Sequence, residues 1–312
     1  MPPEQQNLLK ILDQQAQSHL DGGEMKSALR LSLAAVETAR RAVESESHNL
    51  PYLVRALKRL AVLRLANDQD AAAESHYQEA LDLAEGEAGV DPMEVALIRA
   101  ELGNIYDQRG DWKRAVPLFR GAIETIDSNG GTHREVAAGL RNNLGMILKR
   151  EGEFPEAEQH YKKALSTFSE IYGKESEEVA AVYNNLGGLH YAGGRMKEAL
   201  EMHQEAYALR ESIASGAIEV GQSLCNLAAA YHELNDFVKA DEHYRKALDL
   251  LRDHLEFDSE VYAITSDNYV SLLRENKQEI KAKKIEKNSA SLLDRHHRGR
   301  RDAVQKELTL SN

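Results

Sequence analysis

Apolar and small residues recur along the chain with a period of about 42 residues. Leu102 and Gly103 fall on Leu144 and Gly145 at a shift of 42 residues, and two further copies follow at shifts of 42 and 41. In each copy the leucine, the small residue after it and a bulky residue three places further on lie on one face of a helix. The pattern therefore predicts one amphipathic helix per copy, with a stripe of apolar and small residues.

A second helix is predicted in the other half of each copy. Twelve residues after each Gly or Ala stands another alanine, with an aromatic ring or a histidine four residues later and a further alanine three residues beyond it. These residues share one helical face. A short turn signal, such as Gly110-Asp111 or Asn235-Asp236, separates the two helices. Neither helix can bury its stripe alone, so the pairs are expected to stack on their neighbours. The second-helix residues are Ala115, Phe119 and Ala122; Ala157, Tyr161 and Ala164; Ala199, His203 and Ala206; and Ala240, Tyr244 and Ala247.

Weaker copies extend this pattern in both directions. Ala61, Ala73 and Tyr77 keep the spacing near the N-terminus, whereas Glu286 and Ser289 replace the aromatic and the alanine in the last copy. Degraded end copies are expected because a terminal repeat exposes one face to water. The sequence thus predicts one solenoid over residues 1–290, with repeats near 5–46, 51–92, 93–134, 135–176, 177–217, 218–259 and 260–290, followed by a basic tail or cap extension at 291–312.

The spacing resembles the tetratricopeptide repeat. The phrases Leu140-Arg141-Asn142-Asn143-Leu144-Gly145 and Tyr183-Asn184-Asn185-Leu186-Gly187 are similar to the long repeats of kinesin light chain and related bacterial proteins. The resemblance implies an all-α, right-handed α-solenoid of about seven helix-turn-helix repeats, whose first helices line a concave groove. It also implies that the protein binds another protein or peptide, with asparagines gripping the peptide backbone.

Charge and composition narrow the function. The 312 residues carry a formal net charge of −12, although ten Lys/Arg and five Asp/Glu lie between Asn276 and Asn312. An acidic chain makes a nucleic-acid partner unlikely on bulk charge. Cys225 is the only cysteine, and neither a signal-peptide pattern nor a membrane-length apolar run is present, so a cytoplasmic location is expected. We find no catalytic, cofactor-binding or metal-binding motif and expect a non-enzymatic protein without a cofactor.

The candidate site is the groove face of the first helices. With Gly145 counted as position 8 of its repeat, positions 2, 5, 9, 12 and 13 point away from the apolar stripe and toward the groove, and position 6 lies on the rim of the groove. Asparagine fills many of these places, and its amide both donates and accepts hydrogen bonds. Basic residues in the first half leave an acidic partner among the options. The candidate residues are Arg55, Lys58, Asn104, Gln108, Asn142, Asn143, Lys149, Arg150, Asn184, Asn185, Tyr191, Asn226 and Asn268.

Several alternatives remain open at this stage. The position-6 asparagines could instead bond the loop of the neighbouring repeat, and His203 fits a packed core residue better than a metal ligand. The basic cluster from Arg295 to Arg301 is compatible with a mobile solubilising tail, or with binding to a nucleic acid, an acidic partner or a localisation receptor. The protein could use its convex face as a structural or regulatory module, or be an RNA-associated helical repeat. The sequence leaves the oligomeric state and the identity of the partner undetermined.

Overall fold

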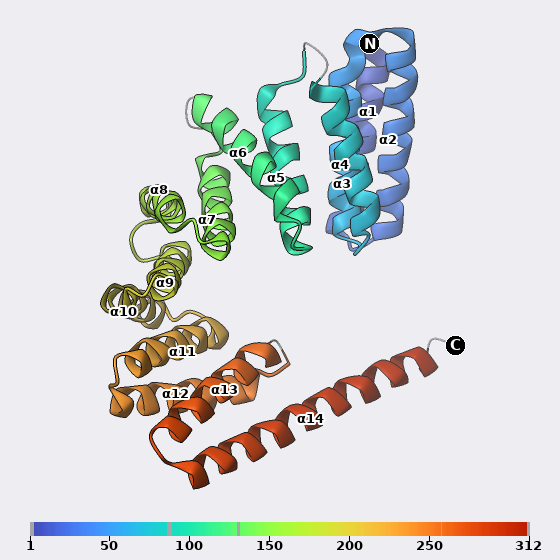
Figure 1. The fold of residues 1–312 in the computed structure, drawn as a ribbon. Helices are drawn as coiled ribbons and strands as arrows, with labels where there is room; N and C mark the ends of the chain where they lie inside the picture. The colour runs from blue at the N-terminus through green and yellow to red at the C-terminus, as the bar shows by residue number, and fades with distance from the viewer. Residues whose placement is uncertain (1–2, 86–88, 130–131, 257, 311–312) are drawn as a thin grey trace. The chain divides into compact units, whose positions relative to one another are not determined.

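The computed structural model describes residues 3–85, 89–129, 132–256 and 258–310. Across these ranges it contains fourteen α-helices, two short 3-10 helices (Ser47–Asn49 and Arg252–His254) and no strand. The expectation of an all-α solenoid of helical repeats is therefore confirmed (Figure 1). The chain divides into two compact units, unit 1 (Met1–Ile147) and unit 2 (Leu148–Asn312), and each is described by itself.

Unit 1 consists of successive helix pairs, and each of its first five helices packs on the next. The close packing arises because small residues on both helices of a pair let the backbones approach. Its helices are α1 (Pro3–Asp21), α2 (Met25–Ser45), α3 (Leu50–Leu65), α4 (Asp70–Glu85), α5 (Pro92–Gln108), α6 (Trp112–Ser128) and most of α7 (Arg134–Glu151).

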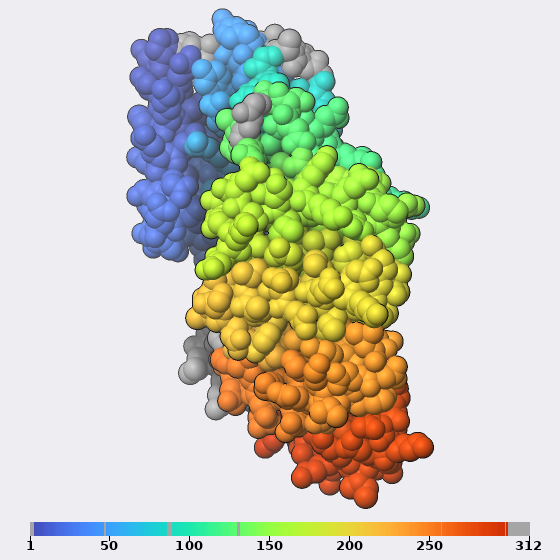
Figure 2. Space-filling model, turned by 90° about the vertical axis from the view of Figure 1, so that its left-hand side faces the viewer, coloured from blue at the N-terminus to red at the C-terminus, as the bar shows by residue number. Residues whose placement is uncertain are grey.

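Unit 2 continues the same pattern from the end of α7. Its consecutive helices pack on one another, and they follow the chain as successive bands of colour in Figure 2. The helices are α8 (Phe154–Tyr172), α9 (Glu177–Ala192), α10 (Met196–Ser212), α11 (Ala217–Glu233), α12 (Phe237–Leu251), α13 (Ser259–Glu275) and α14 (Glu279–Leu310).

The turn inside each helix pair places one residue in the left-handed region. Gly110 has a φ of 71° and Asn235 a φ of 61°. The N–H of Gly110 donates to the carbonyl of Asp107, and the N–H of Asp111 donates to that of Tyr106, so the last carbonyls of α5 are satisfied. Positive φ recurs in the other pairs at Gly23, Asp68, Gly152, Gly194 and Lys277.

The small residue at position 8 lies directly against the ring of the second helix. A Cβ built on Gly103 would lie 2.5 Å from Cε1 of Phe119, and one on Gly187 would lie 2.5 Å from the ring of His203. Phe119 is fully buried and His203 is 3% exposed. The spacing found in the sequence is therefore the packing contact that holds a pair together.

The seventh pair differs from the others in its second helix. α14 passes residue 290, where the seventh repeat was expected to end, and continues as helix to Leu310. Ala282 is buried, and Ile285, Leu292 and Leu293 pack against the core of unit 2. Beyond these residues the helix projects past the helices that it covers (Figure 1).

Candidate functional site

The first helices of unit 2 are linked by a row of hydrogen bonds between positions 5 and 6 of consecutive pairs. The Asn226 Nδ2 group on α11 donates to Asn184 Oδ1 on α9, at 2.8 Å. The Asn268 amide on α13 lies 3.9 Å from the Cys225 sulfur on α11. We call each such pair a rung. The position-6 side chain thus bonds the first helix of the preceding pair rather than its loop.

The Asn184–Asn226 rung retains unused hydrogen-bonding groups. Asn184 Oδ1 lies 3.2 Å from His203 Nδ1 and also accepts from Asn226. Burial, followed by the charge of Lys149, lowers the pKa of His203 to about 4, so the ring is neutral at pH 7 and Nδ1–H is the donor. Within the described residues, the Asn184 Nδ2 group has no protein acceptor, and the Asn226 Oδ1 atom has no protein donor.

A second row of contacts joins position 12 of one pair to position 13 of the next. The Tyr191 hydroxyl donates to Glu233 Oε1 at 2.9 Å, and His232 Nε2 lies 2.9 Å from Glu275 Oε2. Burial, together with the hydrogen bond to Glu233, raises the pKa of Tyr191 to about 12. These contacts therefore engage two acidic side chains of the first helices, Glu233 and Glu275.

Lys149 at position 12 breaks that row because the corresponding position 13 in the next pair is Ala192. The ammonium group lies over α9, 3.4 Å from where a Cβ of Gly188 would be. Lys149 is half-buried, and burial, followed by the charge of Arg150, lowers its pKa. Among the described residues no carboxylate lies within ion-pair distance of Lys149. Unit 2 therefore presents a cation that lacks an acidic partner.

Unit 1 has rungs of a different chemistry. Arg59 at position 6 of α3 forms an ion pair of 2.5 Å with Asp13 at position 5 of α1. Asn143, at position 6 of α7, donates instead to Asn104, at position 9 of α5, at 3.4 Å, so this contact is not a rung. Arg55 and Lys58 both face Glu94 on α5: Lys58 Nζ lies 2.5 Å and Arg55 Nε 4.0 Å from its carboxylate. The basic cluster expected here thus has one carboxylate between two cations.

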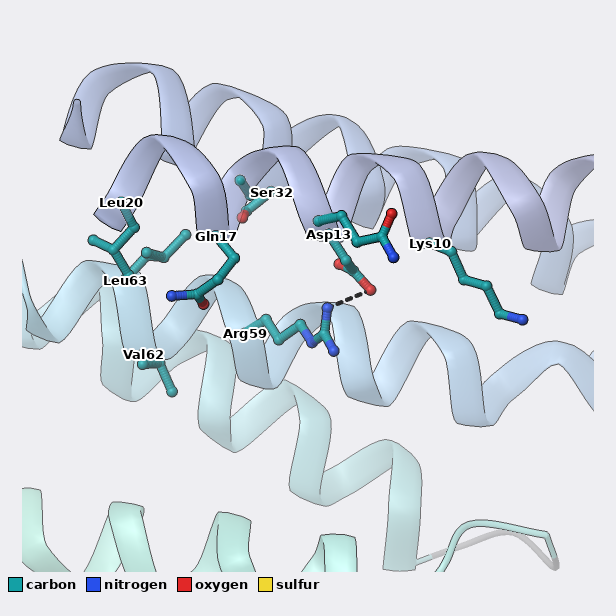
Figure 3. A pocket seen from close by; sticks show the side chains of 10 residues that line it. Lys10, Asp13, Gln17, Leu20, Ser32, Arg59, Val62 and Leu63 are labelled. Carbon is teal, nitrogen blue, oxygen red and sulfur yellow. Dashed lines mark ion pairs between the residues drawn. The ribbon is translucent and has the colours of Figure 1, made fainter. Parts of the chain in front are cut away.

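A hollow of about 470 Å³ opens beside the Arg59–Asp13 rung, between α1, α2 and α3 (Figure 3). Leu20, Leu63 and Val62 line one end, and Lys10 lies at the other (Figure 3). Val62 is 46% exposed, so the apolar end is open to solvent.

The remaining sequence candidates also lie on first helices. Asn142 and Asn185 are half-buried and engaged in interactions, whereas Gln108 and Arg150 are exposed. Sequence reasoning missed Glu94, Asp13 and Lys10. The signal that could have found Asp13 was the pairing of position 5 with position 6 about one repeat later in the chain.

Membrane-spanning helices and metal-binding clusters are both absent from the part of the chain that the structure describes. No helix there is both long and apolar enough to cross a membrane. The described residues also bring no three His, Cys, Asp or Glu side chains into an arrangement suited to a metal ion.

Comparison with known proteins places these helix pairs in a family. The family model of the tetratricopeptide repeat matches residues 52–128 and 135–212, and a second model of this repeat matches residues 221–254. A search of the curated proteins found no match. Tetratricopeptide repeats typically serve as non-enzymatic scaffolds for protein–protein interaction.

Solved structures with the same arrangement include BtubC (BKLC) from P. vanneervenii, which is 32% identical with a TM-score of 0.60, over 75% of this chain and 92% of that chain. Two others show the fold alone. A putative kinesin light chain from Podosopora anserina with nearly identical TPR-like repeats is 18% identical (TM-score 0.53; 65% of this chain, 97% of that one). A Rap protein complexed with competence and sporulation factor is 14% identical (TM-score 0.54; 93% and 97%).

Proposed function

We propose, since this chain belongs to the tetratricopeptide repeat family, that it is a scaffold that binds an extended peptide in the concave groove formed by its first helices. The observation that carries the proposal is the Asn184–Asn226 rung, in which the Asn184 Nδ2 group and the Asn226 Oδ1 atom have no protein partner among the described residues. At the level of the fold, the Rap protein named above is complexed with competence and sporulation factor, which is in keeping with a binding role.

The rung matches the chemistry of a peptide backbone. A peptide group offers one C=O acceptor and one N–H donor. The Nδ2 group of Asn184 supplies the donor for the first, and Oδ1 of Asn226 supplies the acceptor for the second. Each net hydrogen bond contributes about 0.5–1.5 kcal/mol. Because backbone groups are common to all sequences, the rung would contribute affinity with little sequence preference.

Lys149 would add a preference for an acidic ligand. Its ammonium group is half-buried without a carboxylate, which disfavours the charged form. A ligand carboxylate close to Lys149 would stabilise that charge and raise the pKa again. We therefore infer that the preferred peptide carries an Asp or Glu next to the segment that lies over α9 and α11.

The test starts from a displayed library of random peptides, selected on the full-length protein, and uses the recovered peptide as the titrant in calorimetry. Replacing both Asn184 and Asn226 by Ala should weaken binding by about ten- to a hundredfold if the two sets of contacts add. Lys149→Gln should weaken the binding of an acidic peptide in dilute buffer, and the loss of affinity should become smaller as the salt concentration rises. Glu205→Ala on the exposed face of α10 is the matched control and should leave affinity unchanged.

Two results would contradict the proposal that the peptide binds in the groove. Unchanged affinity in the asparagine double variant would move binding to another surface, such as the convex face. Lost affinity accompanied by a collapsed melting curve would mean that the asparagines serve the stacking of the pairs.

As part of the same proposal we place the protein in the cytoplasm, where the single buried thiol of Cys225 would stay reduced.

A further inference from the structure

A second hollow, of about 410 Å³, lies near the end of unit 2, and none of the rung residues lines it. Its lining residues come from α12, the 3-10 helix after it, α13 and α14. Four cations line it: Arg245 and Arg252 on one wall, and Lys281 and Arg295 on the other. In a chain with a net charge of −12, a hollow bordered mainly by positive charge stands out.

The carboxylates near the hollow are too few to neutralise these cations. Arg245 Nε and Lys281 Nζ share Asp241, at 3.1 and 2.5 Å. Burial alone would raise the pKa of Asp241, but hydrogen bonds from Lys281 and Tyr269 hold it below its ordinary value, so the carboxylate is ionised at pH 7. Arg252 pairs with Asp249 at 2.7 Å.

Arg295 has a different kind of partner. Its Nε donates to the carbonyl of Ser291 at 3.3 Å, and no carboxylate of the described residues pairs with it. The four cations therefore face two carboxylates, Asp241 and Asp249.

The wall formed by α14 is an ordered stripe. Lys281, Ile285, Leu292 and Arg295 follow one another at i, i+4, i+11 and i+14, which is one face of a helix. Ile285 and Leu292 are half-buried and lie between the two cations. Fourteen residues of α-helix span about 21 Å, which corresponds to about six residues of extended chain.

We propose that this hollow is a docking site for a short acidic peptide segment of a partner protein, with an apolar side chain against Ile285 and Leu292 and carboxylates beside Arg252 and Arg295. Charge complementarity selects the occupant, and arginine forks suit carboxylates. A single-stranded nucleic acid would need open aromatic faces for its bases. The tyrosines here are closed: Tyr262 is 4% exposed and Tyr269 fully buried.

The experiment uses the full chain and a labelled probe peptide, Glu-Glu-Leu-Phe-Glu-Glu, in fluorescence anisotropy at low and moderate salt. Three comparison probes are the peptide with Gln for every Glu, the peptide with Gly for Leu-Phe, and a single-stranded oligonucleotide of similar charge. The test variant combines Arg252→Glu and Arg295→Glu. The matched control combines Lys284→Glu and Lys287→Glu, which change the same net charge at exposed positions of α14 outside the hollow.

The acidic apolar probe should bind the wild type at least tenfold more tightly than either altered peptide does. The Arg252 and Arg295 variant should bind this probe at least tenfold more weakly than the wild type. The affinity of the lysine control should stay within twofold of the wild type. Equal losses in both variants would overturn the proposal, because diffuse charge would then explain binding. Preferential binding of the oligonucleotide would also overturn it. Neutral replacement of both arginines by Gln provides a second variant if the charge reversal lowers the melting temperature. The Asn184 and Asn226 double variant should bind this probe normally, which separates this site from the groove.

Discussion

Units 1 and 2 build the same rung from different chemistry. In unit 1 the rung between α1 and α3 is an ion pair of Asp13 with Arg59, whereas in unit 2 the rung between α9 and α11 is an amide pair of Asn184 with Asn226. The residue types differ, but a donor at position 6 meets an acceptor at position 5 in both. The comparison shows that these two pairs of first helices are matched by complementary groups rather than by one residue type.

One pair of each unit also differs in the ring that packs on the small residue of the first helix. Phe119 fills that place in the α5–α6 pair of unit 1, and His203 fills it in the α9–α10 pair of unit 2. Both rings are buried, but only the histidine titrates between pH 4 and 7. Unit 2 therefore carries an acid sensitivity that the α5–α6 pair of unit 1 lacks.

The largest expected effect comes from replacing His203, which should remove the difference in acid sensitivity between the two pairs. The pKa of His203 is about 4 in the folded protein and about 6.5 in an unfolded chain, so the unfolded state binds the proton first as the pH falls. The contribution of His203 to the free energy of unfolding is fully present above pH 6.5. It falls by about 3 kcal/mol in total as the pH decreases from 6.5 to 4. His203→Phe should reduce the dependence of the unfolding free energy on pH in that window, as measured by urea unfolding.

His48→Phe, at an exposed histidine, is the control for the substitution itself. If His203→Phe unfolds with the same pH dependence as the wild type, His203 is not the titrating group.

A smaller effect is expected from the close contact itself. Gly103→Ala would place a Cβ 2.5 Å from the Phe119 ring, and overpacking of this kind costs about 1–3 kcal/mol. Gly139→Ala lies in a helix interior with nothing within 4 Å of the new Cβ, and should stabilise by about 0.5–1 kcal/mol. Thermal unfolding of the two variants should move the melting temperature in opposite directions, and a shift of the same sign would contradict the packing argument.

The smallest effects separate the two kinds of rung. Arg59→Gln removes a partly exposed ion pair, worth about 0.2–1 kcal/mol and screened by salt. Asn226→Ala removes a neutral hydrogen bond, worth about 0.5–1.5 kcal/mol at any salt concentration. Unfolding measured at low and high salt should therefore show a salt-dependent loss for Arg59→Gln alone. Equal salt dependence in both variants would show that the rungs do not differ in kind.

The sequence by itself determined the helices and their packing faces. Periodicity places Gly103, Phe119 and their counterparts on facing stripes, and Gly or Asn marks the turn at Gly110 and Asn235. These features depend on residues a few places apart in the chain, so local spacing is sufficient to find them. The expectation of a scaffold for protein–protein interaction follows from the same repeats.

The tertiary structure alone decided which polar groups are paired and which stay available. Asn184 meets Asn226 and Tyr191 meets Glu233 across about one repeat, and the register between pairs selects those partners. Lys149 is unpaired because that register brings Ala192 to the place where a carboxylate stands in the later pairs. The hollow beside α14 likewise depends on how three helices pack. Pairing and burial are properties of residues brought together from distant parts of the chain, and the pattern of one helix does not contain them.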